Sequence, residues 1–324
     1  MTGGSYVIRT PQLVAKGAAE DDGLHLGTIV VEGERFSRSV FDTAASVRAV
    51  SGSEIDANPG ASDVQDVLAG IPNVTTFGQG NDAPSIRGQQ SVGPLVSEQA
   101  FFSGTTPRAT LTVDGRRLPF NEYTFCLGSV WDVDTFEIFR GPQTTSQGAN
   151  SIAGAFYLRT NDPAFSTKGK LRFSAGNLGG RQISAMYNTQ LIEDELAVRV
   201  ALDYQTRDSF VSFNSPGQQL IPDLSELEQF TGRVKLLWEP AWLPGLSTKL
   251  TYSRTDSRAP QTENIDQPFK KLTRTSNPVP PPFTNKSDTL IHDISYEFSP
   301  SFALSNKFYL SDFESDRSLH RMDL

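Results

Sequence analysis

From residue 170 onwards, apolar and polar side chains alternate along the chain with a period of two. The clearest segment sets Val198, Val200, Leu202 and Tyr204 against Arg199, Ala201, Asp203 and Gln205. Because successive side chains of a strand point to opposite faces, this alternation predicts a half-buried β-strand. The same pattern predicts about seven strands, near residues 170–175, 182–191, 198–205, 230–238, 246–253, 289–298 and 302–311.

The connections between these strands alternate in length. Short links near 192–195, 239–245 and 299–301 alternate with links near 177–180, 208–225 and 254–288, two of which are long. Short turns at one rim and longer loops at the other are typical of outer-membrane barrels, so we expect the short set to be periplasmic and the long set extracellular. Four aromatic residues lie near the strand ends: Trp238, Trp242, Tyr252 and Tyr296. They fit an aromatic belt at the membrane interface. The alternative is that they belong to the core of a soluble β-sandwich.

The first half of the chain carries a different set of signals. Residues 63–74 have Val64, Val67 and Leu68 at helical spacing and end in Gly70 and Pro72, which predicts an amphipathic helix. Asp114-Gly115 predicts a tight hairpin, because a two-residue primed turn needs positive φ. An apolar strand then runs into Gly141-Pro142 and a polar turn, and Gly148, Gly154 and Ala155 lead into a second strand.

Four of these segments, in this order, resemble the plug domain of TonB-dependent outer-membrane receptors. Residues 63–74 resemble its first helix and "P-G-V" ending, with Asn73 in place of glycine; 85–88 resemble its "I-R-G" strand end, 111–119 its "V-D-G" hairpin and 139–159 its closing motif. The resemblance covers nearly the whole chain. It implies an α+β plug domain at 37–163, followed at 164–324 by the first part of an antiparallel transmembrane β-barrel. Since about seven strands cannot close the roughly 22-stranded barrel of this family, we expect a piece of a longer receptor.

The amino-terminal segment resembles the energy-coupling region of the same family. Residues 11–36 read as a linker rich in Ala, Gly and acidic side chains, interrupted by a β-branched run that resembles a TonB box: Thr28, Ile29, Val30 and Val31. Such a segment would bind the periplasmic domain of TonB by β-augmentation. Residues 1–10 resemble the last strand of a periplasmic signalling domain, which would add an anti-sigma regulator as a partner.

The resemblance also suggests two groups of site residues in the plug. Arg87, Glu137 and Arg140 would form a latch in which the plug arginines pair with carboxylates on the barrel wall. Plug loops at 77–85 and 120–125 would face a small-molecule ligand, with Asn121, Tyr123 and Phe125 as contacts. Their aromatic and amide groups suit a siderophore, a sugar or a plant-derived aromatic compound.

Composition narrows the classes of function. The net charge of −8 and pI near 5.0 argue against nucleic acid as a partner. Mean hydropathy is −0.34, and no run of about 18 apolar residues predicts a membrane helix. A transmembrane barrel is compatible with this value, because only every second side chain of a barrel strand faces the lipid. The lone Cys126 and the scattered His25, His292 and His320 predict no metal site. No secretory signal opens the chain.

No catalytic constellation stands out, and we expect neither an enzyme nor a cofactor. The pattern therefore predicts active import of a scarce nutrient, such as a siderophore-like iron complex, across the outer membrane of a Gram-negative bacterium, with the plug gated by TonB. One alternative remains open, a soluble or surface-attached β-rich ligand-binding module without transport. A passive porin is disfavoured, because a porin needs no plug of this size.

Overall fold

The computed structural model describes residues 3–9, 30–31, 38–39, 46–58, 60–76, 84–91, 108–125, 128–143, 151–216, 224–260, 263–276, 282–300 and 302–316. Most of the second half is a single curved antiparallel sheet, called the wall here. Its strands follow the chain order: β11 (Lys168–Ala175), β12 (Arg181–Ile192), β13 (Leu196–Asp208), β15 (Glu226–Trp238), β16 (Leu246–Ala259), β18 (Phe283–Ser299) and β19 (Phe302–Asp316). These seven strands confirm those predicted from the alternation.

The two faces of the wall also follow the predicted alternation. On β13, Leu202 and Tyr204 are 44% and 42% exposed, whereas Ala201 and Asp203 on the opposite face are buried. Large apolar side chains continue the exposed face on neighbouring strands, among them Phe173, Ile183, Tyr187, Val234, Leu250 and Tyr252. An exposed apolar face opposite a polar buried face is the arrangement expected of a lipid-facing barrel wall.

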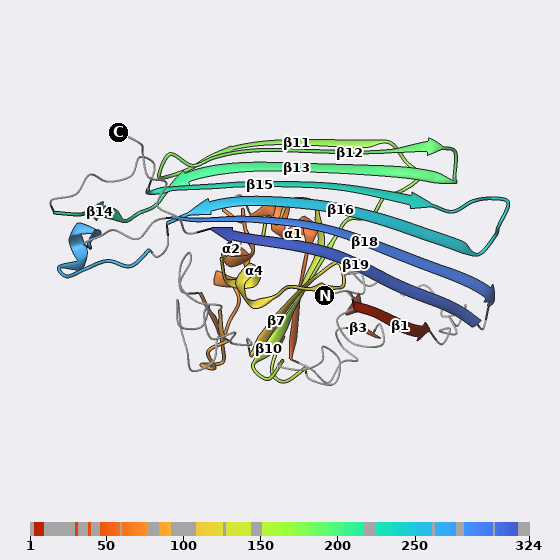
Figure 1. Cartoon of the computed structure of the whole chain (residues 1–324), viewed down its shortest axis with the longest axis horizontal. Helices are drawn as coiled ribbons and strands as arrows, with labels where there is room; N and C mark the ends of the chain where they lie inside the picture. Colours follow the sequence, from red (N-terminus) through yellow and green to blue (C-terminus); the bar gives the residue numbers. More distant parts are fainter. Residues whose placement is uncertain are drawn as a thin grey trace, which may run out of the picture.

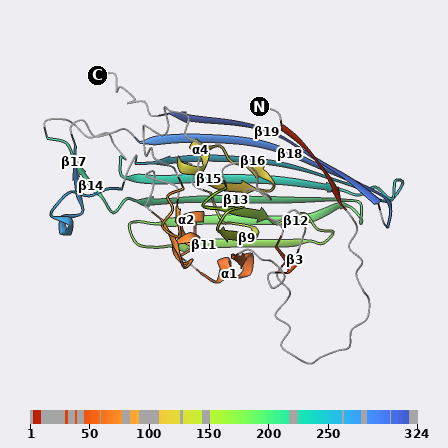
Figure 2. The same cartoon turned by 90° about the horizontal axis from the view of Figure 1, so that it is seen from below.

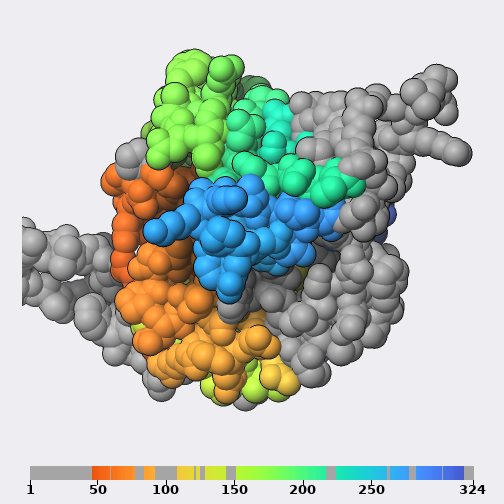
Figure 3. All heavy atoms as spheres, turned by 90° about the vertical axis from the view of Figure 1, so that its left-hand side faces the viewer, coloured from red at the N-terminus to blue at the C-terminus, as the bar shows by residue number. Residues whose placement is uncertain are grey.

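Short and long connections separate to opposite ends of the wall, as predicted (Figure 1). At the turn end, the links between paired strands are 193–195, 239–245 and 300–301. The loop end carries the longer connections, which include β14 (Ser212–Asn214), the 3-10 helix η1 (Phe269–Lys271) and β17 (Thr273–Thr275). Figure 3, which faces this end, shows plug residues in orange beside the η1 and β17 segment in blue.

A smaller α+β domain, the plug, lies against the concave face of the wall (Figures 1 and 2). Its five-stranded sheet has the order β4-β9-β10-β7-β8. The strands are β4 (Val47–Ser51), β7 (Ala109–Val113), β8 (Arg116–Arg117), β9 (Val133–Arg140) and β10 (Gly154–Thr160). Strand β10 is parallel to β7 and antiparallel to β9, so the two halves of the predicted closing motif are neighbours.

Helices and short strands complete the plug core. They are α1 (Gly52–Ala57), α2 (Val64–Ala69), α4 (Phe120–Phe125), β5 (Val74–Thr75) and β6 (Ser85–Ile86). Asp63 caps α2 in a capping box with Asp66, and Val64, Val67 and Leu68 are buried, as predicted. Two elements differ from expectation: α1 was not predicted, and 120–125 form a helix where a loop was expected.

Backbone geometry explains several of the motif residues. Asp114 and Gly115 have φ of 48° and 85°, which is the primed turn that the sequence predicts between β7 and β8. Asn73 has φ of 64°. That left-handed conformation favours glycine, and asparagine is the side chain that tolerates it best, which accounts for Asn73 at a position where the family motif has glycine.

Three strands near the amino terminus lie apart from the plug sheet. β1 (Gly3–Arg9) pairs antiparallel with β19 at the edge of the wall, from Gly3 opposite Tyr309 to Arg9 opposite Ala303. β2 (Val30–Val31) pairs with β3 (Arg38–Ser39). The first strand thus lies on the wall edge here, where the sequence suggested part of a separate signalling domain.

No helix in the described ranges combines the length and the apolar character needed to cross a membrane.

Candidate functional site at the contact of plug and wall

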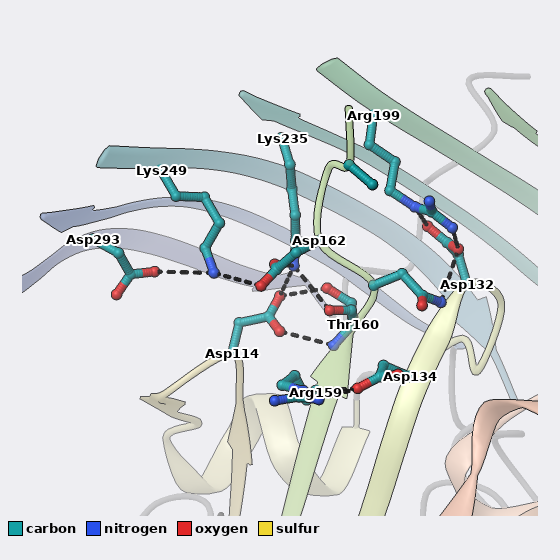
Figure 4. A network of polar contacts seen from close by, with 12 residues as sticks. Asp114, Asp132, Asp134, Arg159, Thr160, Asp162, Arg199, Lys235, Lys249 and Asp293 are labelled. Atoms are coloured by element: carbon teal, nitrogen blue, oxygen red, sulfur yellow. Dashed lines mark hydrogen bonds and ion pairs between the residues drawn. The ribbon is translucent and has the colours of Figure 1, made fainter. Parts of the chain in front are cut away.

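Cations on the wall face carboxylates of the plug along one row (Figure 4). Arg199 on β13 donates from Nε to Asp132 Oδ2 at 2.8 Å and pairs again through Nη2. Their side chains are only 11% and 5% exposed. Asn161 supports the same carboxylate through a bond of 3.1 Å. Such a pair is withdrawn from water on both sides, so each partner depends on the other.

Lys235, on the strand next to Arg199, is the centre of the row. It is 2% exposed, and its Nζ donates to Asp162 Oδ1 at 2.8 Å and to the Thr160 carbonyl at 3.1 Å, with Asp114 Oδ2 at 3.4 Å. A lysine buried this deeply needs such partners. Asp114 in turn accepts from the backbone N–H and hydroxyl of Thr160 at 2.8 and 2.6 Å.

The row continues across the next strands of the wall. Lys249 on β16 pairs with Asp162 Oδ2 at 2.8 Å and with Asp293 on β18 at 3.8 Å. Lys307 on β19 pairs with Asp293 at 3.0 Å and donates to the Asp114 carbonyl at 2.7 Å. We call this whole row the anchor belt: Asp114, Asp132, Asp162, Arg199, Lys235, Lys249, Asp293 and Lys307.

Two acidic members of the belt, Asp114 and Asp162, are held in their charged form. Burial by itself would raise the pKa of Asp162, but Lys235 and Lys249 outweigh it and lower the pKa to about 2. Burial opposes ionisation of Asp114 as well, yet Lys235, Arg233 and the Thr160 hydrogen bonds lower its pKa. Asp114 and Asp162 therefore stay ionised at neutral pH, opposite the wall cations.

A second contact joins the first plug helix to the first wall strand. Asp56, at the end of α1, pairs with both Lys170 and Arg172 of β11. Both cations also lie over the ring of Trp131, at 4.7 and 5.0 Å from its centre. The Trp131 indole N–H donates to the Ala185 carbonyl of β12 at 3.0 Å. The side chains of Asp56, Lys170 and Arg172 are more exposed than the centre of the belt, whereas Trp131 is buried.

Further polar contacts are buried between the two domains. Ser129 donates to Asp203 of β13 at 2.6 Å, and Ser287 of β18 donates to Glu122 at 2.6 Å. Glu122 also accepts two bonds from Arg116, at 2.8 and 2.6 Å. The plug is thus held along its length by hydrogen-bonded polar groups rather than by an apolar interface.

The predicted latch residues lie elsewhere in the plug. Glu137 is fully buried on β9, which lies between β4 and β10 in the plug sheet. Arg140, at the end of β9, donates to the Pro72 carbonyl at 3.3 Å, and Arg87 is an exposed residue with φ of 51°. The structure does not bring these three to the anchor belt, where the charges are the reverse of those expected: plug carboxylates pair with wall cations.

The predicted ligand contacts fall on α4. Tyr123 is 9% exposed and packs in the plug core against Phe156, with ring centres 6.3 Å apart, and burial raises its pKa. It is a core residue here rather than a side chain on an exposed loop. The side chains of Asn121 and Phe125 and the predicted loop residues 77–83 lie outside the described part of the chain.

The predicted TonB box is partly described. Val30 and Val31 form β2, with backbone pairing to Ser39 and Arg38. Thr28 and Ile29 lie outside the described residues.

Sequence reasoning pointed to four of the eight residues of the anchor belt, but not to their partners. Alternation placed Arg199, Lys235 and Lys249 on the polar face of their strands, and the hairpin motif singled out Asp114. Asp132 and Asp162 carried no motif, and their partners are set by the way the plug docks on the wall.

Comparison with known proteins agrees with this architecture. Residues 39–155 match the model of the TonB-dependent receptor plug domain. The fold is similar to that of the ferric yersiniabactin uptake receptor FyuA from Yersinia pestis, with a TM-score of 0.69, 20% identity and coverage of 86% of this chain and 42% of that one. It is also similar to the ferripyoverdine receptor of the outer membrane of Pseudomonas aeruginosa, with a TM-score of 0.67, 15% identity and coverage of 89% and 37%.

A third similar structure is the alcaligin outer-membrane receptor FauA from Bordetella pertussis, with a TM-score of 0.64, 15% identity and coverage of 87% and 41%. The chain thus spans about two fifths of the length of these receptors. The matches confirm the resemblance and the fold class drawn from the motifs. Residues 39–155 therefore match the plug domain of TonB-dependent receptors, and the wall that follows has the fold of the first part of the barrel in the similar solved structures.

Proposed function

We propose that this chain forms the plug and first barrel strands of an active importer that takes up a siderophore-like iron complex across the outer membrane. One observation carries the proposal: a plug domain is seated on the concave face of a half-polar wall through ionised groups that can separate without unfolding an apolar core. The similar solved receptors are described as binding or importing siderophores such as yersiniabactin and pyoverdine.

The proposed mechanism couples the plug to TonB in the periplasm. TonB pairs with the backbone of Thr28, Ile29, Val30 and Val31 and pulls the amino-terminal end of the plug. Strand β4 follows this segment and lies at the edge of the plug sheet, paired with β9 alone among the described strands. An edge strand can be withdrawn without breaking the pairing of the strands behind it, which suits a plug that loosens stepwise.

Ligand binding is proposed at the loop end, between plug loops and barrel loops. Figure 3 shows plug residues reaching this face beside the η1 and β17 segment. Asn121 and Phe125 stay candidates for ligand contact, whereas Tyr123 would act by supporting α4 from the core. Arg87, Glu137 and Arg140 stay candidates for a latch to other parts of the complete barrel.

The test is an uptake assay in cells that express the full-length receptor. Ile29→Pro and Val30→Pro remove backbone donors that β-augmentation needs, so uptake of iron-loaded siderophore should be abolished while surface binding is nearly unchanged. Val30→Thr, which keeps the β-branch and the backbone donor, is the matched control. Wild-type uptake in both proline variants would contradict coupling through this segment.

A further inference from the structure

The wall cations of the anchor belt lie at one level across the barrel strands. Arg199 is directly opposite Lys235 in the pairing of β13 and β15, Lys249 is opposite Asp293 in the pairing of β16 and β18, and Asp293 is opposite Lys307 in the pairing of β18 and β19. Figure 4 shows Arg199, Lys235 and Lys249 reaching from the wall towards the plug. The row therefore belongs to the wall and would remain when the plug moves.

Displacement of the plug changes the charge of this row. Asp114 and Asp132 lie within the plug sheet region and would leave with it, whereas Asp162 lies in the connection to β11 and Asp293 lies on β18. The four cations Arg199, Lys235, Lys249 and Lys307 would then face only two carboxylates, which leaves a surplus of two positive charges on the wall.

In this confined space Arg199 would lose Asp132 and Lys235 would lose Asp114, while Lys249 and Lys307 keep their contacts with Asp162 and Asp293. Lys235 is 2% exposed and the Arg199 side chain 11% exposed while the plug is in place. A cleft lined by one sign of charge beside low-dielectric walls concentrates counter-ions of the opposite sign. An anionic molecule that passes this level can replace the departed carboxylates, whereas an uncharged one cannot.

We propose that the belt cations are a specificity row for cargo, which binds an anionic iron complex during its passage. The inference rests on the proposed import function and names the charge class of its substrate. In the closed state Asp132 occupies Arg199 and Asp114 occupies Lys235, which keeps other anions from this part of the row. Plug and cargo thus compete for Arg199 and Lys235, and Lys249 and Lys307 add to the positive charge of the row.

The experiment compares two iron complexes in cells that express the full-length receptor. One probe is a trianionic ferric tris-catecholate and the other an uncharged ferric tris-hydroxamate, both labelled with radioactive iron. The uptake rate of each complex is divided by the amount of that complex bound at the surface of energy-depleted cells. This normalisation removes differences in recognition by the outer loops. The wild type should import the anionic complex about tenfold faster per bound complex, the lower end of electrostatic steering effects.

Variants separate a cargo contact from a merely structural role. The double variant Lys249→Gln with Lys307→Gln should bring the ratio of the two rates close to one, and the charge-keeping pair Lys249→Arg with Lys307→Arg should preserve it. Asp56→Asn is the matched control on the plug side. It weakens the contact of the plug with Lys170 and Arg172, which lie outside the belt, so it should change both rates alike and leave the ratio in place.

Each outcome decides between the two proposals. Equal rates for both complexes in the wild type, or a ratio that the glutamine pair leaves unchanged, would overturn the cargo row while import itself stands. If neither complex enters, import of iron complexes fails. The cargo row is then judged from the reversal potential of the receptor in a planar bilayer with its plug unfolded by urea. Preference for chloride over potassium, lost in the glutamine pair, supports the row, and its absence refutes it.

Discussion

At the scale of single residues, the pair of Arg199 and Asp132 should be the most sensitive contact between plug and wall. Asp132→Asn leaves a buried guanidinium without a counter-charge, so we expect a loss of about 3–5 kcal/mol in unfolding free energy. Tryptophan fluorescence follows the transition, because Trp131 is next to Asp132 and bonds to the wall. A double-mutant cycle with Arg199→Gln isolates the coupling between the two side chains.

The matched control is the exposed pair of Arg48 and Glu54, whose side chains are 42% and 49% exposed. Glu54→Gln should cost at most about 1 kcal/mol, because water and salt screen such pairs. Similar losses at the two sites would show that burial of the Arg199 pair has no energetic weight.

Asp63 should make the stability of the plug depend on pH. It is 8% exposed at the start of α2, and burial together with the neighbouring Asp66 carboxylate raises its pKa to about 7. The folded state then binds more protons than the unfolded state between about pH 4 and pH 7. Stability contributed by the neutral acid is therefore present at low pH and is lost as the pH rises through 7.

Asp63→Asn tests this dependence and keeps a residue that caps helices well. We expect the variant to be more stable than the wild type at pH 8, by the order of 2–4 kcal/mol, and equal to it near pH 4. Thermal unfolding across that range measures the difference. Parallel stability curves for the two proteins would rule out a raised pKa at this position.

At the scale of elements, the two faces of β13 should respond oppositely to charge. Leu202 is 44% exposed on the apolar face, so Leu202→Arg should destabilise the barrel in lipid by about 2–4 kcal/mol. Gln205 lies on the opposite face, where it bonds to Gln229 at 2.9 Å. Gln205→Arg should lose about 1 kcal/mol for that bond. Refolding titrations into lipid vesicles compare the variants, and equal effects would contradict the assigned register.

At the scale of the whole molecule, plug and wall should differ in solubility. The plug, residues 37–163, has its own core of buried side chains from α2, β7, β9 and β10, and we expect it to be soluble and at least partly ordered when produced alone. The wall exposes large apolar side chains such as Leu171 and Phe173, at 71% and 74%. The 324-residue chain should therefore aggregate without detergent.

Sedimentation and semi-native gels measure this difference. The chain should give no heat-resistant band, and detergent should reduce its aggregation. A monodisperse monomer that melts cooperatively in detergent-free buffer would contradict the lipid-facing assignment and favour a soluble β-rich binding module instead.

The sequence by itself determined the strands, their faces and their connections, because a strand with one polar and one apolar face must alternate with a period of two. It also determined the hairpin at Asp114-Gly115 and the helix from Val64, since turn geometry and capping are local. Helix α1 escaped prediction because six residues carry too little periodicity, and Tyr123 was placed on a loop because burial depends on distant neighbours such as Phe156. Only the tertiary structure decided which carboxylate meets which cation. Asp132 and Arg199 are 67 residues apart, and their pairing follows from how the plug docks against the wall, for which no local pattern exists.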